Sequence, residues 1–540
     1  MSLRARLTLE GRARTLRPNR AGRRGSLFFM RHFVPRAIGV AVLCLTGFAV
    51  AADRAVGAGP LYCRYRLTLE PGEGVQALGP LWIRKEVWPE RRTGRLGPDE
   101  WLSEKQRRDP AVVSRIARSF TIAPLFSWYT DPSVDASFFD FLYPVVTYDR
   151  YGTESRFQIF QLISFSGGRQ QRAAENERIY TLFPFFFTRR SPDPERRYTA
   201  VWPVYGHLQS RLFRDDIRFV LWPLYVRTRK RDVVTDNYVA PFVHRRRGDG
   251  LKGWQVWPLI GHERKSFTYR TNTIGELEPV GGHNKWFALW PLYARAEAGF
   301  GTTNRMSSRM VLPFYSHQKT PAKESTSYLW PFGVTLSADR QIGYRQTSVI
   351  WPFFIRARGP GKHEDRVWPF YGYLRYRELT SRFFLWPVFS HRQVTRETYR
   401  KDIQQVALVL YNRTRESNGE TGQSQMRVGL WPLFLWKSDW EGRRHFQFLA
   451  PLSTLMPKNE SIARTYAPFF ALWRSEKNAQ TGAASQSALW NLYRRETTPK
   501  TKKCSLLFGL FQYEKGPSGR RVKLFFLPLT KRRPAAAPRS

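Results

Sequence analysis

The sequence predicts an all-β protein, an antiparallel meander of about 20 short strands repeated every ~19 residues. Two apolar runs separated by a short charged connection form the basic pattern, as in RFVLWPLYVRTRKRDVVTDNYVAPFVHRRR at 218–247. Each run has a proline at its centre and ends in arginine. Connections of this length favour antiparallel neighbours, because parallel strands need crossovers of a dozen or more residues.

The repeat can be followed through its prolines, most of which stand between 17 and 24 residues apart. They are Pro124, Pro144, Pro184, Pro203, Pro223, Pro241, Pro258, Pro291, Pro313, Pro331, Pro352, Pro369, Pro387, Pro432, Pro451, Pro468 and Pro528. Four further runs lack the proline but keep the apolar residues, around Leu162, Leu408, Trp490 and Gly509. Residues 271–285 contain no such run, and we expect a long loop there.

Each apolar run is predicted to be a strand and not a helix. The runs are short and rich in β-branched and aromatic residues, which pack well on a pleated surface. A central proline also disfavours a helix, since it removes a donor and clashes with the preceding turn. Proline is equally awkward in a central strand. We therefore expect a bulge or bend at each Trp-Pro step.

The chain divides into five segments in order. Residues 1–29 are a basic leader, predicted to be disordered or to precede the true start. Residues 30–51 combine a basic start, an apolar stretch and a small-x-small site, which predicts a signal peptide. Residues 52–118 are predicted to hold irregular strands and one short helix starting at Asp109-Pro110. The repeat array occupies 119–530, and 531–540 form a disordered basic tail.

Alternation along the runs places apolar side chains on both faces of each strand. In VIWPFFIRAR at 349–358 neither face is polar through the centre. The repeated tryptophans, such as Trp222, Trp290 and Trp386, are therefore expected to be core residues. Burial on both faces suits stacked sheets, as in a propeller or sandwich, or a barrel with a filled interior. Because an open sheet would leave two unprotected edges, we predict closure into a large barrel or ring, with a β-propeller or stacked-sheet repeat as the alternative.

Two cysteines remain after the predicted signal peptide, Cys63 and Cys504. They lie at opposite ends of the strand array. Closure would bring the first and last strands together, so Cys63 and Cys504 are a candidate disulfide in an exported protein.

The formal net charge is +45, and about +36 without residues 1–51. This balance indicates anionic partners and says nothing of the fold. For an exported protein those partners are outer-membrane lipid, lipopolysaccharide or another polyanion, and nucleic acid is not expected. The candidate anion-binding residues are Arg227, Arg229, Arg245, Arg246, Arg247, Arg356, Arg358, Arg375 and Arg377. The plainer interpretation is that arginine only solvates strand ends and turns.

No catalytic or phosphate-loop motif interrupts the repeat. Four histidines follow a repeat proline by four residues: His207, His262, His317 and His391. Their strands stand too far apart for one zinc ion, and we expect His207 to lie on a strand of opposite direction to the other three. We therefore predict no metal, no cofactor and no catalytic residue.

These observations favour a non-enzymatic, bacterial-type cell-envelope protein, a barrel or scaffold handling lipid or lipopolysaccharide. Its predicted location is the cell outer membrane or the periplasm. The alternative is a soluble exported β-repeat module that binds an anionic polymer through its arginines. An enzyme whose site is assembled from loops is the least favoured class.

Overall fold

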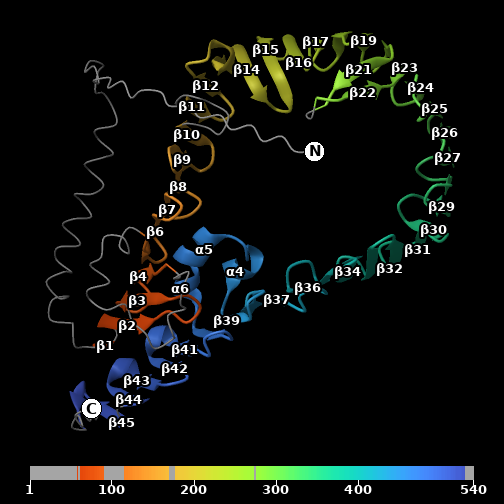
Figure 1. Ribbon diagram of the computed structural model, residues 1–540. Coiled ribbons are helices and arrows are strands. Elements are labelled where there is room, and N and C mark those ends of the chain that lie inside the picture. The colour runs from red at the N-terminus through yellow and green to blue at the C-terminus, as the bar shows by residue number, and fades with distance from the viewer. Residues whose placement is uncertain are drawn as a thin grey trace, which may run out of the picture. The chain divides into compact units, whose positions relative to one another are not determined.

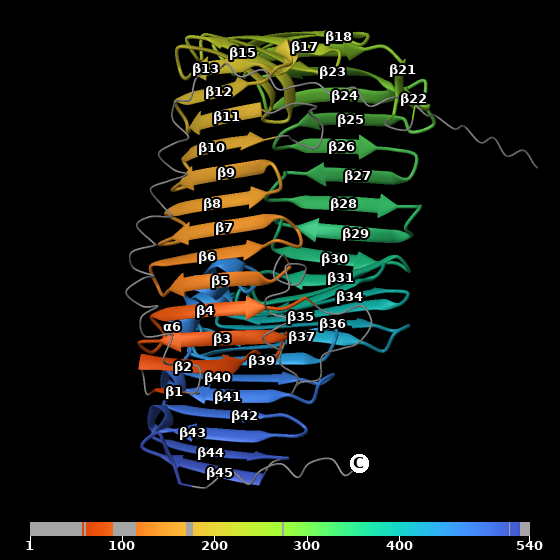
Figure 2. The same ribbon diagram turned by 60° about the vertical axis from the view of Figure 1, so that its left-hand side comes forward.

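A computed structural model describes residues 57–58, 61–89, 115–168, 177–272, 275–517 and 519–529. Their strands form one antiparallel sheet of 44 strands and a separate pair, β21–β22 (Figures 1 and 2). All belong to one compact unit that begins at Gly57. The leader, the predicted signal peptide and the basic tail lie outside the described residues.

The first strands of the sheet are β1 (Gly57–Ala58), β2 (Tyr62–Arg66), β3 (Gly72–Ala77), β4 (Trp82–Val87), β5 (Ala117–Ile122), β6 (Phe126–Asp131), β7 (Ala136–Phe141), β8 (Val146–Tyr151), β9 (Glu154–Ile159), β10 (Ile163–Gly168), β11 (Glu177–Leu182) and β12 (Phe186–Arg190). They are followed by β13 (Tyr198–Val201), β14 (Tyr205–Arg211), β15 (Arg214–Val220), β16 (Tyr225–Lys230), β17 (Val233–Tyr238), β18 (Val243–Gly248), β19 (Leu251–Val256), β20 (Ile260–Lys265), β21 (Thr268–Thr271), β22 (Leu277–Val280), β23 (Gly282–Ala288) and β24 (Tyr293–Phe300).

The second half contains β25 (Met306–Val311), β26 (Tyr315–Lys319), β27 (Lys323–Tyr328), β28 (Val334–Asp339), β29 (Tyr344–Val349), β30 (Phe354–Arg358), β31 (Lys362–Val367), β32 (Tyr371–Tyr376), β33 (Leu379–Phe384), β34 (Phe389–Arg396), β35 (Tyr399–Val406) and β36 (Tyr411–Asn418). The last strands are β37 (Ser424–Leu430), β38 (Phe434–Ser438), β39 (Arg443–Phe448), β40 (Trp473–Asn478), β41 (Ala484–Ala488), β42 (Tyr493–Thr497), β43 (Lys502–Leu506), β44 (Phe511–Gly516), β45 (Gly519–Leu524) and β46 (Leu527–Pro528).

Within the described residues, helical segments are few and short. They are η3 (Pro194–Arg196), α4 (Pro451–Leu455), α5 (Glu460–Thr465), α6 (Ala467–Phe470), η4 (Leu489–Asn491) and η5 (Leu507–Gly509). The all-β class and the antiparallel meander are confirmed. Each strand pairs with its neighbours in sequence, and β20 pairs with β23 across the β21–β22 insertion.

The repeat unit is a hairpin, and the prediction of one proline-centred strand per unit is wrong. The apolar run around Pro223 shows why: β15 ends at Val220, residues 221–224 turn, and β16 begins at Tyr225. The turn is closed by a bond from the Leu224 amide to the Leu221 carbonyl at 2.7 Å. The Trp222-Pro223 peptide is cis. A proline in the turn removes no ladder donor, so no bulge is needed at the Trp-Pro step.

Other predicted boundaries also change. Residues around Pro451 and Pro468 fold as α4 and α6, where proline suits the first helical turn. The expected loop at 271–285 contains β22 and the start of β23. The helix expected after Pro110 lies mostly outside the described residues, and the chain is already strand β5 at Ala117.

The two faces of the sheet differ. We call one of them the inner face: it is the face on which side chains near β2 and β3 contact side chains near β41 and β42. This face is rich in small residues, which let aromatic rings lie flat across neighbouring strands. A methyl group added at Gly206 would lie 2.3 Å from the Phe219 ring, and Gly372 stands in the same relation to Phe383 at 2.0 Å. Glycine is required there for this close approach. Phe219 belongs to a small buried apolar cluster with Tyr198, Ala200, Leu208, Ile217 and Val226.

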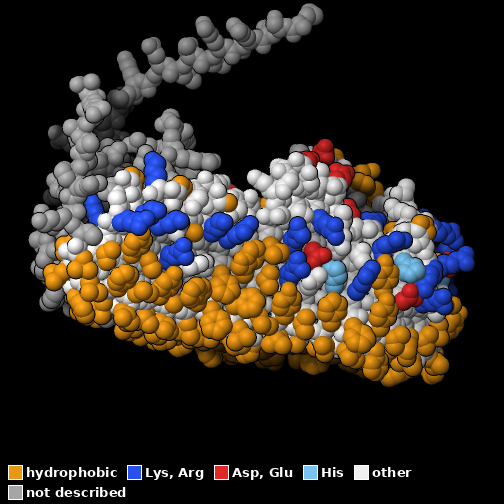
Figure 3. Space-filling model, turned by 90° about the horizontal axis from the view of Figure 1, so that it is seen from below, with side chains coloured by type: hydrophobic (Ala, Val, Ile, Leu, Met, Phe, Trp, Pro, Cys, Tyr) orange, Lys and Arg blue, Asp and Glu red, His pale blue; other side chains and the backbone are white. Residues whose placement is uncertain are grey.

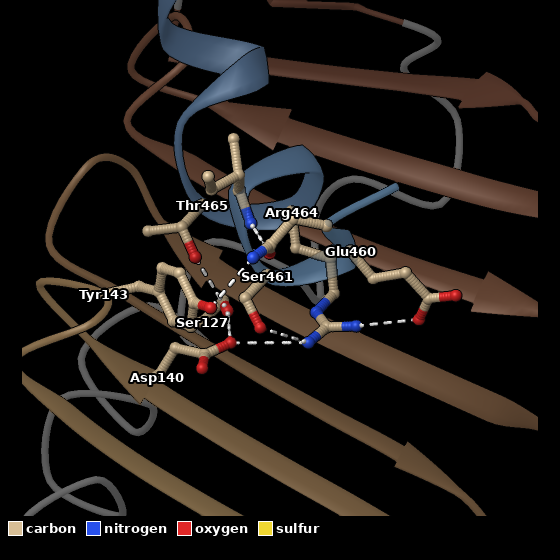
Figure 4. A network of polar contacts seen from close by, with 9 residues as sticks. Ser127, Asp140, Tyr143, Glu460, Ser461, Arg464 and Thr465 are labelled. Atoms are coloured by element: carbon tan, nitrogen blue, oxygen red, sulfur yellow. Dashed lines mark hydrogen bonds and ion pairs between the residues drawn. The ribbon is translucent and has the colours of Figure 1, made fainter. Parts of the chain in front are cut away.

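Side chains join the two ends of the sheet in what we call the seam, drawn in part in Figure 4. From α5, the Arg464 guanidinium lies 3.3 Å from an Asp140 carboxylate oxygen on β7. The Thr465 hydroxyl donates to Ser127 Oγ on β6 at 2.9 Å. Further along, Thr68 donates to Ser485 at 2.6 Å. Among the described strands, no backbone ladder links β1 or β2 to β45 or β46.

Charged side chains are buried where β2 meets β40 and β42. The Arg494 guanidinium lies 4.0 Å from the centre of the Tyr65 ring, and burial raises the pKa of Tyr65. Burial also acts to raise the pKa of Glu476, but Arg474 and His445 outweigh it and hold that pKa below its usual value. The charges at the seam are therefore compensated by named partners.

The two cysteines are free thiols, and the strand register explains why. Cys63 pairs with Gln76, which faces the seam and bonds Asn491. Cys504 pairs with Arg495, whose neighbour Arg494 is the residue that points into the seam. Successive residues of a strand point to opposite faces. Cys504 therefore lies on the outer face and Cys63 on the inner face.

Candidate functional site

One margin of the sheet is built almost wholly from apolar turns, and we call it the proline margin. It comprises the turns with the repeat prolines other than Pro451, Pro468 and Pro528, and the equivalent turns without proline at 160–162, 407–410, 489–492 and 507–510. Figure 3 shows hydrophobic side chains gathered along one side of the molecule and basic side chains away from it. Large side chains stand well into solvent here: Phe314 is 66% exposed and Phe332 76%.

The tryptophans of the Trp-Pro step lie on this margin and not in a core. Trp222 and Trp290 are each 45% exposed and Trp386 is 47% exposed, so the prediction that they are core residues is wrong. They fall in turns, where one side of the ring has no neighbouring strand. Their rings contact each other along the margin, as between Trp202 and Trp222 at 5.6 Å and between Trp368 and Trp386 at 6.0 Å.

Directly behind the turns, the outer face carries an unbroken apolar row. This first outer row consists of the residues that end one strand or begin the next at the proline margin, each paired with the following one. Along the sheet it runs Trp82, Ile122, Phe126, Phe141, Val146, Ile159, Ile163, Leu182, Phe186, Val201, Tyr205, Val220, Tyr225, Tyr238, Val243, Val256, Ile260, Ala288, Tyr293, Val311, Tyr315, Tyr328, Val334, Val349, Phe354, Val367, Tyr371, Phe384, Phe389, Val406, Tyr411, Leu430, Phe434, Phe448, Trp473, Ala488, Tyr493, Leu506, Phe511 and Leu524.

Two residues further from the margin, the same face carries a second outer row that changes character along the sheet. From β5 to β11 it is aromatic: Phe120, Trp128, Phe139, Tyr148, Phe157, Phe165 and Tyr180. From β14 to β36 it is dominated by arginine and histidine, including Arg218, Arg227, Arg245, Arg295, Arg309, Arg356, Arg382 and Arg413. From β14 to β36, polarity therefore rises from the turn tips toward the strand centres.

The four repeat histidines all belong to this second outer row. They lie on β14, β20, β26 and β34, which all run away from the proline margin, so the expected opposite direction of His207 is wrong. At least three other strands separate any two of them. Each has its own partner: His207 contacts Asp216 at 2.7 Å, His391 contacts Asp402 at 2.9 Å and His262 contacts Asn284 at 2.8 Å. Within the described residues, no group of three or more His, Cys, Asp or Glu is placed to hold a metal ion.

The candidate anion-binding arginines do not form one site. Arg227 and Arg247 on the outer face both contact Asp236, at 2.7 and 3.5 Å. Arg246 lies on the inner face, where it forms an ion pair with Glu263. Burial acts to raise the pKa of Glu263, but Arg246, His283 and Lys285 outweigh it and lower that pKa.

The other six candidate arginines are dispersed. Two lie on β30, and four lie elsewhere on the outer face or at the opposite margin. Arg358 contacts Asp365 at 2.7 Å, and Arg356 stands beside it in the second outer row. Arg229, Arg245 and Arg375 lie on the outer face, while Arg377 is in a turn at the opposite margin with its guanidinium 5.7 Å from the Tyr376 ring centre. Several of these charges are thus solvated strand ends with an acidic partner.

The opposite margin has ordinary polar turns. Gly152, Gly250 and Gly343 adopt positive φ there, which suits glycine in tight hairpin turns. Leu212 and Phe213 are an exception, an isolated apolar pair at the tip of the β14–β15 turn, with Phe213 96% exposed. The two margins of one sheet therefore present opposite chemistry.

No protein-family model matches this chain, and no curated protein matches its sequence. No helix within the described residues is long and apolar enough to cross a membrane. The function must therefore be argued from the apolar margin and the rows behind it. Sequence reasoning missed this surface because it placed the proline inside a strand. The signal was present in the order of residues after each proline, as in Tyr225, Arg227 and Arg229.

Proposed function

We propose that the protein is a non-enzymatic scaffold that stands on a membrane, with its proline margin inserted into one leaflet. The observation that supports this most directly is the unbroken first outer row behind exposed Leu, Trp, Pro and Phe turns. Large contiguous apolar surfaces on a soluble protein mark a place where another apolar phase is met. Tryptophan and tyrosine backed by arginine are the usual order of side chains at a bilayer interface.

The dimensions support insertion into one leaflet. The turn tips stand roughly 10 Å from the second outer row, at about 3.3 Å per residue. Interfacial protein segments bury their apolar side to a similar depth of about 5–10 Å. Typical strands such as β16 have six residues, or about 20 Å, and only one end is apolar. Spanning strands need about 9–11 residues with an apolar band in the middle.

We also propose that the sheet closes into a ring, with the seam as its joint. The support is the set of side-chain bonds between β2–β7 and α5–β42, including Arg464–Asp140 and Thr68–Ser485. This joint is made by side chains, and within the described residues β1 and β46 each pair with one neighbouring strand only. With the signal peptide predicted at 30–51, the target membrane is one of the cell envelope, so the outer membrane and the periplasm remain the proposed locations.

A soluble module that binds an anionic polymer is the less favoured alternative. Its arginines would need to be available, whereas Arg227 and Arg247 share Asp236 and Arg358 contacts Asp365. It also gives no reason for an apolar margin. Lipid contact explains both the apolar turns and the basic row behind them.

The test is co-flotation of the full chain with phosphatidylcholine vesicles. The double variant Phe314→Asp and Phe332→Asp places two carboxylates at the proline margin, and we expect at least a tenfold loss of vesicle binding, because each buried aromatic contributes about 1.5–3 kcal/mol. The matched control is Leu212→Asp with Phe213→Asp, which makes the same kind of change on the opposite margin and should leave binding unchanged.

Two results would contradict the proposal. Equal flotation of both double variants and the wild type would show that the proline margin does not meet lipid. A wild-type chain that is a dimer without lipid, and that Phe314→Asp with Phe332→Asp splits into monomers, would assign the margin to a second copy of this chain. Light scattering after size-exclusion chromatography measures that state.

A further inference from the structure

One cluster of the second outer row concentrates positive charge. Arg295 on β24 pairs directly with Arg309 on β25, and Arg309 pairs directly with His317 on β26. Directly opposite side chains on neighbouring strands stand about 4.5–5.5 Å apart, and like charges in this relation destabilise a sheet. The chain therefore keeps two guanidinium groups side by side at a cost.

Among the described residues, glutamates form ion pairs with the two outer members of this cluster, Arg295 and His317, but not with Arg309 at its centre. Arg295 contacts Glu297 at 2.6 Å, and His317 contacts Glu324 at 3.2 Å. Arg309 forms no ion pair with any residue between 57 and 529 that the structure describes. Arg309 is exposed, as is Ser307 two residues away on the same face. The Arg309 side chain is therefore accessible to a ligand from solvent.

The cluster lies at the depth where lipid phosphates would be met. Tyr293, Val311 and Tyr315 of the first outer row separate it from the turn tips, and Leu292 and Phe314 stand at those tips. If the apolar margin is inserted, the second outer row coincides with the headgroup layer. Two adjacent guanidinium groups suit a phosphate, because each presents paired donors in a fixed plane.

We propose that Arg295, Arg309 and His317 form a binding site for the phosphate of an anionic lipid headgroup. This inference rests on the proposed insertion of the proline margin and assigns a ligand to one place behind it. The phosphate oxygens accept hydrogen bonds from Arg309 and from the donors of Arg295 that do not contact Glu297. His317 flanks the site, with its Nε2 on Glu324.

The experiment compares flotation with phosphatidylcholine vesicles and with vesicles that also contain phosphatidylglycerol. We expect the wild type to prefer the anionic vesicles and Arg309→Gln to lose about fivefold of that preference, while keeping its binding to phosphatidylcholine. The matched control is Arg340→Gln, which removes the same charge from the turn between β28 and β29 at the opposite margin. Its preference should equal that of the wild type.

Arg309→Lys separates a phosphate site from diffuse attraction, since lysine keeps the charge but loses the paired donors. We expect it to resemble Arg309→Gln. Full preference in Arg309→Lys, or an equal loss in Arg340→Gln, would overturn the site and leave the proposed function standing. Full displacement from anionic vesicles by inorganic phosphate in excess over the lipid phosphate, at constant ionic strength, would reassign the site to a soluble anion. A wild type that binds neither vesicle would remove both proposals.

Discussion

Strands β5–β11 and strands β14–β36 share one backbone plan and one apolar margin, yet they differ on both faces. In the first region the second outer row is aromatic, and the inner face is covered at β5 and β6 by α5. In the second region most residues of that row are arginine or histidine, interrupted by residues such as Trp254, Trp286 and Leu336, and the inner face carries small polar side chains such as Ser316, Ser327 and Thr335.

This difference separates two requirements on the sheet. The margin needs only apolar turns and the first outer row; the row is kept along the sheet from β4 to β45, and the turns are replaced by α4–α6 between β39 and β40. The rows behind them are free to vary, and they set how deep each region would sit. An aromatic second row extends the apolar band by about two residues, or ~7 Å, whereas arginine at that position would end it at the headgroups.

The largest expected effect concerns the seam of the first region. Arg464→Gln removes the partner of Asp140, a carboxylate that is almost fully buried, and we expect a loss of about 3–5 kcal/mol in the free energy of unfolding. Hydrogen exchange should rise in β6, β7 and α5 and stay unchanged in β25–β29. The matched control is Arg396→Gln, which breaks an exposed pair with Glu378 in the second region and should cost at most about 0.5 kcal/mol. If the two variants lost similar amounts of unfolding free energy, the seam would be no more sensitive than the second region, and the prediction would be wrong.

An intermediate effect is expected from exchanging the second outer row between the regions. Phe165→Arg gives the aromatic region the basic pattern, and Arg245→Phe does the reverse. We expect Phe165→Arg to lower binding to phosphatidylcholine vesicles by about tenfold, because burying one phenyl ring contributes about 1.5–3 kcal/mol. Arg245→Phe should raise that binding. The sedimented fraction over a lipid titration measures both, and changes of the same sign would show that depth is not set by this row.

The smallest effect is expected from acid. The pKa of Glu476 is held below its ordinary value of 4.5 in the folded protein. A carboxylate with a lowered folded pKa contributes stability above its unfolded pKa and loses it as the pH falls further. We therefore expect the melting temperature to fall by a few degrees between pH 5 and pH 3, with part of that slope absent in Glu476→Gln. The same slope in that variant would place the acid sensitivity elsewhere.

The largest pKa shifts caused by burial lie beside the seam and not in strands β14–β36. Burial raises the pKa of Tyr129 on β6 to about 12, with help from Asp131. The ring of Tyr129 lies 5.3 Å from the Arg464 guanidinium, at the centre of the seam. Burial also shifts the pKa of Lys85 on β4, but in the opposite direction, because the charged form of lysine is the protonated one: it lowers that pKa to about 8. Both groups lie where the two ends of the sheet meet.

The sequence by itself determined the fold class, the antiparallel connectivity and the regular period. Short runs of Val, Leu, Phe, Tyr and Trp with short charged connections leave few other structures, because they bury their apolar groups only by pairing with their neighbours. It also placed the units that lack proline, around Leu162, Leu408, Trp490 and Gly509, all of which are apolar turns in the structure. The net charge led to two interpretations, anionic partners or solvated strand ends, and the sequence alone does not choose between them.

Only the tertiary structure decided where each run bends and which side chains share a face. An apolar run such as RFVLWPLYV is compatible with one bent strand or with two strands and a turn, since local propensity is the same in both. Once the turn falls at Leu221–Leu224, the register changes, Trp222 moves from core to margin, and Tyr225 aligns with Tyr238 in a row that no single unit reveals. The seam is likewise a tertiary result. Arg464 and Asp140 are 324 residues apart in sequence, and only the curvature accumulated over all the intervening strands brings them together.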